Sequence, residues 1–63
     1  MATFSLEFNT DNAAFGDDDA EHGAEVARIL RDIAARCEDG PPIVGVIRDV
    51  NGNRVGMFHS DRE

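Results

Sequence analysis

Three acidic side chains occur at the alternate spacing with which a calcium-binding loop begins. They are Asp17, Asp19 and Glu21. The glycine that such a loop requires at its sixth position is replaced by His22, and Arg28 stands where a bidentate glutamate belongs. We therefore expect no metal site in this segment, and its simplest interpretation is a solvated acidic loop.

The other metal-binding residue types are scattered along the chain. Residues 49–53 also begin like a calcium loop, but Arg54 takes the place of the glycine. A zinc site would need His22, His59 and Cys37 or carboxylates brought to about 2 Å from one ion. The sequence predicts no metal site.

Catalytic chemistry has little support in the residue pattern. No serine, threonine or lysine nucleophile is set beside a base, and the glycines form no phosphate-binding loop. A domain of one helix and three strands also offers little room for a small-molecule pocket. We therefore expect no catalytic residue and no cofactor, and a protein that is not an enzyme.

Sixty-three residues allow one domain, spanning 1–63. Residues 3–8 alternate so that Phe4, Leu6 and Phe8 share one face, which predicts a half-buried strand. A short helical turn is expected at 13–15, capped by Thr10 or Asp11, and its Phe15 is expected to fill the core.

A helix is predicted over residues 20–38. The glycine and prolines of residues 39–42 supply its stop signal. We expect Arg28 to pair with Glu25 or Asp32, and Asp32 with Arg36. The expected apolar stripe, widened by Ile29, consists of Gly23, Val26, Ala27, Leu30, Ile33, Ala34 and Cys37.

Two further strands, 43–48 and 54–59, flank the hairpin signal Asn51-Gly52. A two-residue loop would pair Asp49 with Arg54. We favour instead a type I turn with Gly52 in the left-handed conformation and a bulge, because Asp49, Asn51 and Gly52 each suit that geometry.

The resulting order, β-α-β-β, predicts an α+β fold, a three-stranded sheet with the helix packed on one face. If strand 54–59 is central, the sheet is antiparallel throughout. A parallel pairing of strands 3–8 and 43–48 through a right-handed crossover is the alternative.

The net charge of −7 is concentrated in the first half of the chain. Up to Ala27 there is no basic residue, whereas the six arginines and six acidic residues that follow balance each other. Such a field repels nucleic-acid phosphates and attracts basic surfaces. The acidic residues of the first half are Glu7, Asp11, Asp17, Asp18, Asp19, Glu21 and Glu25.

One cysteine cannot form an intrachain disulfide, and no apolar run is long enough to span a membrane. The N-terminus also lacks the features of a signal peptide. We expect a protein of the bacterial cytoplasm, without membrane or direct nucleic-acid binding, that is a monomer or a homodimer through a strand edge.

Three segments, DNAAF (11–15), ARILRDIA (27–34) and RDVNGNRVG (48–56), resemble short uncharacterised phage and prophage proteins of about this length. Small acidic proteins of mobile elements include anti-CRISPR and other anti-defence inhibitors, some of which mimic DNA. The resemblance implies an inhibitor that covers a basic surface of a host defence complex.

Our leading hypothesis is therefore an acidic protein-binding module, with the seven acidic residues of the first half as its contact surface. The alternative is a phage structural or accessory protein that homodimerises, in which the acidic face serves only solubility.

Overall fold

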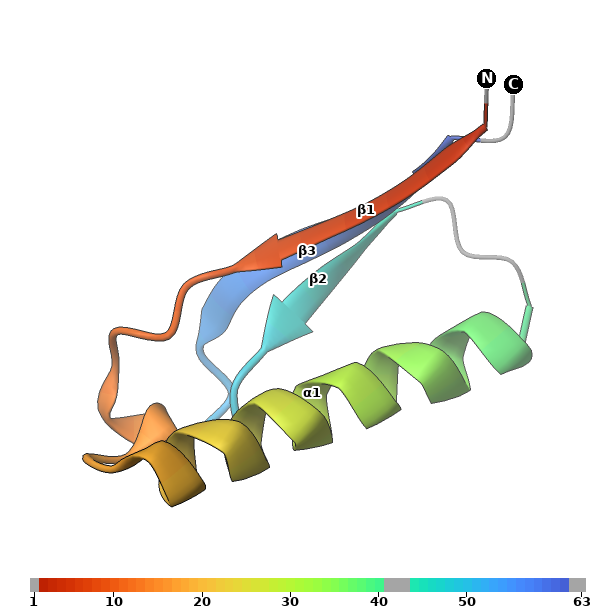
Figure 1. The fold of residues 1–63 in the computed structure, drawn as a ribbon. Coiled ribbons are helices and arrows are strands. Elements are labelled where there is room, and N and C mark those ends of the chain that lie inside the picture. Colours follow the sequence, from red (N-terminus) through yellow and green to blue (C-terminus); the bar gives the residue numbers. More distant parts are fainter. Residues whose placement is uncertain (1, 41–43, 62–63) are drawn as a thin grey trace.

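The computed structural model describes residues 2–40 and 44–61. Its elements follow the order β1 (Thr3–Phe8), η1 (Ala13–Phe15), α1 (Asp19–Glu38), β2 (Val44–Arg48) and β3 (Arg54–Asp61) (Figure 1). The predicted α+β fold and its β-α-β-β order are confirmed. Pro41, Pro42 and Ile43, where we expected the stop signal to end and the second strand to begin, lie outside the described residues.

The sheet is antiparallel throughout, in the order β1-β3-β2. Leu6 of β1 lies opposite Phe58, and Val46 of β2 lies opposite Met57. The alternative of a parallel pairing between the first two strands is therefore wrong. Because β3 is central, β1 and β2 are the two edges of the sheet.

The β2–β3 hairpin has the bulged turn that we favoured. The backbone N–H of Gly52 donates to the carbonyl of Asp49 at 2.9 Å, and Gly52 has a φ of 86°. The N–H of Asp49 in turn donates to the carbonyl of Asn53 at 2.9 Å, and the strand register shifts between Ile47 and Arg48. A type I turn with glycine in the left-handed conformation has this pattern.

The core lies between α1 and the face of the sheet that it covers (Figure 1). Its buried residues come from η1, α1, β2 and β3, and they are Phe15, Ile29, Ile33, Ile47, Val55 and Phe58. The prediction that Phe15 fills the core is confirmed.

The predicted apolar stripe of α1 was partly wrong. The buried residues of the helix are Glu25, Ile29 and Ile33, whereas Leu30 is 44% exposed and Ala34 is exposed. These three buried positions are four residues apart and form one line along the helix. The buried face is therefore centred on Ile29 and Ile33.

Strand β1 is less covered than its alternation suggested. Phe4 stacks on Phe58 and Phe8 stacks on Phe15, so the apolar face of β1 is on the helix side of the sheet. Phe4 is nevertheless 45% exposed and Leu6 is 39% exposed. The reason is that α1 packs mainly against β2 and η1.

Candidate functional site

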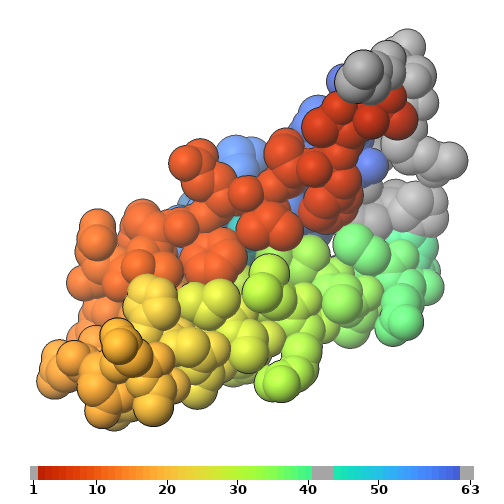
Figure 2. Space-filling model, in the orientation of Figure 1, coloured from red at the N-terminus to blue at the C-terminus, as the bar shows by residue number. Residues whose placement is uncertain are grey.

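Five of the seven candidate acidic residues lie in one continuous segment between β1 and the first turn of α1. This segment forms one end of an elongated molecule whose principal extents are 40, 19 and 19 Å (Figures 1 and 2). All five are exposed. We call this group the acidic tip; it consists of Asp11, Asp17, Asp18, Asp19 and Glu21.

Two members of the acidic tip have a structural role at the start of α1. The Asp18 carboxylate, at the N-cap, accepts a hydrogen bond from the backbone N–H of Glu21 at 2.8 Å. The Glu21 carboxylate accepts one from the backbone N–H of Asp17 at 3.0 Å. This is a variant of the capping box, and both charges also favour the positive end of the helix dipole.

The other three carboxylates, of Asp11, Asp17 and Asp19, accept no hydrogen bond from the residues that the structure describes. Within 2–40 and 44–61, the ion pairs are Arg28 with Glu25 and Arg36 with Asp32. Neither pair involves the acidic tip, whose charge is therefore not neutralised by a described arginine.

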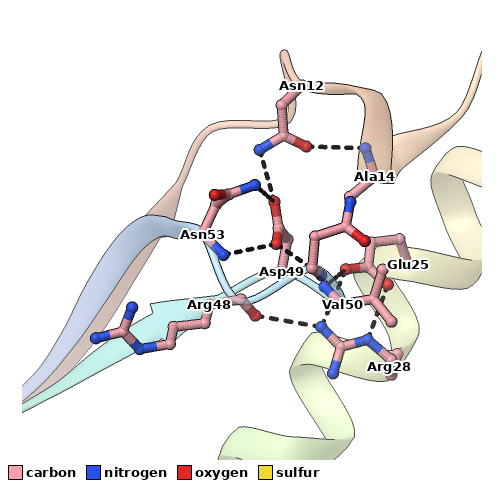
Figure 3. A network of polar contacts seen from close by, with 9 residues as sticks. Asn12, Ala14, Glu25, Arg28, Arg48, Asp49, Val50 and Asn53 are labelled. Atoms are coloured by element: carbon pink, nitrogen blue, oxygen red, sulfur yellow. Dashed lines mark hydrogen bonds and ion pairs between the residues drawn. The ribbon is translucent and has the colours of Figure 1, made fainter.

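Glu25 does not belong to this exposed surface. Only 7% of it is accessible, and Arg28 donates to both of its oxygens, from Nε at 2.8 Å and from Nη2 at 3.0 Å. The backbone N–H of Val50 donates a third hydrogen bond at 2.9 Å (Figure 3). The Arg28 guanidinium holds the pKa of Glu25 below its ordinary value against the opposing effect of burial. Glu25 joins α1 to the hairpin turn and cannot meet a partner.

Asp49, at a position predicted to lie in the hairpin turn, is a second buried carboxylate. It accepts hydrogen bonds from the backbone N–H groups of Asn51 and Asn53, each at 2.9 Å, and from Asn12 Nδ2 at 2.8 Å (Figure 3). Burial acts to raise the pKa of Asp49, but the hydrogen bonds from Asn53, Asn12 and Asn51 outweigh it and leave that pKa lowered.

Asn12 links the acidic tip to this network. Its Oδ1 accepts from the N–H of Ala14 at 3.0 Å, which makes Asn12 the N-cap of η1 in place of the predicted Thr10 or Asp11. Its amide nitrogen meanwhile reaches Asp49. The loop that carries Asp11 is therefore fixed to the hairpin at one point.

Glu7 is separate from the acidic tip. Its neighbours Leu6 and Phe8 face the helix side, so alternation along β1 places Glu7 on the opposite face of the sheet. The seven predicted residues thus divide into the acidic tip, one residue on the outer sheet face and one buried residue.

The described residues include no group of three histidine, cysteine or carboxylate side chains placed to hold a metal ion. His22 lies beside the ring of Phe15, with 6.1 Å between ring centroids, and Cys37 is half-buried against the core. His59 belongs to β3, and its partner on β1 is Ser5. These three side chains belong to separate surroundings.

No protein-family model, curated protein or solved structure matches this chain. Among the described helices, none has the length and apolar character needed to cross a membrane.

Proposed function

We propose that this protein is a binding module whose acidic tip docks on a basic surface of another protein. The observation that carries the proposal is the exposure of Asp11, Asp17 and Asp19 within residues 11–19, with no described arginine paired to them. Capping of α1 accounts for Asp18 and Glu21, and the charge of Asp19 in the first turn favours the helix dipole, but the start of the helix gives Asp11 and Asp17 no structural role.

The geometry suits a basic groove better than a small ligand. The tip is one end of an elongated molecule, and its carboxylates can each accept hydrogen bonds from arginine side chains. Opposite charges on the two partners would speed their encounter. The narrower proposal is a phage- or prophage-encoded inhibitor that fills a host protein's DNA-binding channel, with carboxylates where phosphates would lie.

The experiment is a fluorescence anisotropy titration with a labelled octa-arginine peptide as the basic probe, at low and high salt. We expect the affinity to fall roughly tenfold as the salt rises from about 0.05 to 0.3 M, because exposed charges are screened over about 10 Å or less. The double variant Asp17→Asn with Asp19→Asn removes two exposed ion pairs, each of which contributes about 0.2–1 kcal/mol of binding free energy. The dissociation constant should therefore rise about 2- to 30-fold.

Glu38→Gln is the matched control, since Glu38 is exposed at the other end of α1. The control removes one charge and the double variant removes two, so a control that loses half as much binding free energy as the double variant would show that only total charge matters, and would overturn the proposal. The narrower proposal is tested by a pull-down from bacterial lysate, followed by competition with duplex DNA. A captured protein that keeps its DNA in the complex would refute DNA mimicry.

A further inference from the structure

The two edges of the sheet carry different backbone groups, and the hydrogen bonds show which ones face outward. The N–H of Asn9 donates to the carbonyl of Val55 at 3.0 Å, which continues the β1–β3 register as a hydrogen-bonded pair. Hydrogen-bonded and non-hydrogen-bonded pairs alternate in an antiparallel ladder. Thr3, Ser5 and Glu7 therefore bond to β3, while the N–H and C=O groups of Phe4, Leu6 and Phe8 point away from the sheet.

The edge formed by β2 is blocked by two arginines of α1. By the same alternation, the backbone groups of Val46 and Arg48 point outward from β2. Arg36 Nη1 and Nη2 both donate to the Val46 carbonyl at 3.0 Å, and Arg28 Nη2 donates to the Arg48 carbonyl at 3.2 Å. The Arg36 guanidinium also lies 5.0 Å from the ring centroid of Phe58. A further strand could not add to β2 without displacing these side chains.

No side chain among the described residues covers the edge formed by β1 in this way. Outside the sheet ladder, the hydrogen bonds of the described residues include none to the backbone of Phe4, Leu6 or Phe8. Figure 2 shows β1 on the near surface directly above α1. Charges, proline or a covering segment usually protect such an edge, and Glu7 is the one charged residue of β1.

Apolar side chains line this uncovered edge. Phe4 and Leu6 are 45% and 39% exposed. On α1, residues turn by about 100° each, so Leu30 projects from the flank opposite to Arg28, which reaches β2. Leu30 therefore lies on the β1 side of the helix, with 44% of its surface exposed. We call this surface the open edge; it consists of the outward backbone of Phe4, Leu6 and Phe8 and the side chains of Phe4, Leu6 and Leu30.

We propose that the open edge pairs with the open edge of a second copy of this chain, β1 against β1 and antiparallel, about a two-fold axis at Leu6. In this register Leu6 lies opposite the partner's Leu6, and Phe4 lies opposite the partner's Phe8. Every outward N–H and C=O of these three residues then finds a partner, and the two sheets become one continuous sheet.

The position of Glu7 favours this register over its neighbours, and in this register the edge of one copy can pair with the same edge of a second copy. Glu7 comes to lie opposite the partner's Ser5. A shift of two residues in one direction would set Glu7 against the partner's Glu7, and the opposite shift would carry Phe8 beyond the end of the partner's strand. The open edge is thus complementary to itself in one register.

The dimer is expected to be weak. Two strands of this length bury less than the roughly 1,200 Å² of a standard stable interface, and each copy carries a net charge of −7. Added salt screens the repulsion between the copies and should therefore strengthen the dimer. The acidic tip should show the opposite dependence on salt.

Sedimentation equilibrium over a range of protein concentrations tests the proposal. We expect wild type to dimerise as its concentration rises from about 10 µM to about 1 mM, more strongly at high salt. Leu6→Lys should weaken dimerisation at least tenfold with an unchanged far-UV spectrum. The matched control is Val44→Lys, on the blocked edge, where 56% of Val44 is exposed; it should behave like wild type.

A cross-linking measurement fixes the register. In a Cys37→Ala background, Leu6→Cys should form a disulfide-linked dimer under mild oxidation, because Cα atoms of a hydrogen-bonded pair lie about 5.5 Å apart. Val44→Cys should not. Wild type that stays monomeric at every concentration and salt, or loss of dimer in Val44→Lys alone, would overturn the proposal. The double variant Asp17→Asn with Asp19→Asn should weaken binding of the basic peptide but leave dimerisation unchanged. The proposal on the acidic tip and the proposal on the open edge can therefore fail independently.

Discussion

Replacement of Glu25 by glutamine tests whether the buried carboxylate holds α1 to the hairpin. The substitution keeps the size of the side chain and one acceptor oxygen, but it removes the charge and places an NH₂ group where an oxygen had accepted a hydrogen bond. The three donors affected are Arg28 Nε, Arg28 Nη2 and the backbone N–H of Val50, at 2.8, 3.0 and 2.9 Å.

The expected loss follows from these contacts. A hydrogen bond to a charged group contributes about 1.5–3 kcal/mol, but Arg28 is 41% exposed, so water replaces part of what it loses. We therefore expect Glu25→Gln to lower the free energy of unfolding by about 1–3 kcal/mol. A chain of 63 residues has a total stability of roughly 3–9 kcal/mol, so this is a large fraction.

Urea denaturation followed by far-UV circular dichroism measures the loss. With a slope of about 1 kcal/mol/M, the midpoint should fall by about 1–3 M. Glu38→Gln, on the exposed end of the same helix, should change stability by less than about 0.5 kcal/mol. A midpoint for Glu25→Gln equal to that of wild type would refute a stabilising role for this carboxylate.

Acid adds a second readout. Because the pKa of Glu25 is lowered on folding from 4.5, its charge stabilises the fold above that value and the contribution is lost as pH falls through the folded pKa. The difference between wild type and Glu25→Gln should therefore shrink below about pH 4. A difference that stays constant from pH 7 to pH 3 would assign the loss to packing instead.

Three further predictions concern the sheet, the helix cap and the hairpin. In Gly56→Ala the new Cβ would meet the backbone of Glu7, so thermal melting should show a free energy of unfolding lower by about 1–3 kcal/mol. Gly23→Ala is the control: Gly23 faces open space on α1, so this substitution should raise the free energy of unfolding by about 0.5–1 kcal/mol. Asp18→Ala removes the N-cap of α1 and should cost about 0.5–2 kcal/mol in urea denaturation; no loss would mean that the cap is dispensable. Since the pKa of Asp49 is also lowered from 3.8, Asp49→Asn should weaken the fold at pH 7 and flatten the fall in stability below about pH 4, as measured by melting temperature against pH.

Local patterns predicted most of the fold because each pattern allowed only one or two physical solutions. Alternation over residues 3–8 indicated a strand with one apolar face, and Asp49 with Gly52 indicated the bulged turn that sets the hairpin register. The face of α1 was harder to predict. Counting apolar residues favours Leu30 and Ala34, whereas the helix buries the line that includes Glu25, because Arg28 neutralises that charge in place.

The candidate site was predictable only as far as chain neighbours stay neighbours in space. Asp11, Asp17 and Asp19 are close in sequence, and a loop that leads into a helix cap keeps them at one end of the molecule. Glu7 and Glu25 lie on elements whose orientation depends on tertiary packing. A helical acidic residue three positions before an arginine is a local sign of an ion pair, but burial of the pair depends on where the hairpin turn lies.

The positions of Arg28 and Arg36 distinguish the surfaces of this protein. Arg28 binds Glu25 of α1, and Arg28 and Arg36 both bind outward carbonyls of β2, while none of the described arginines forms an ion pair with the acidic tip. The same use of arginine closes one edge of the sheet and leaves β1 open. The placement of the arginines therefore bears on both proposals, and salt separates them: screening should weaken contacts made by the acidic tip and strengthen contacts made by the open edge.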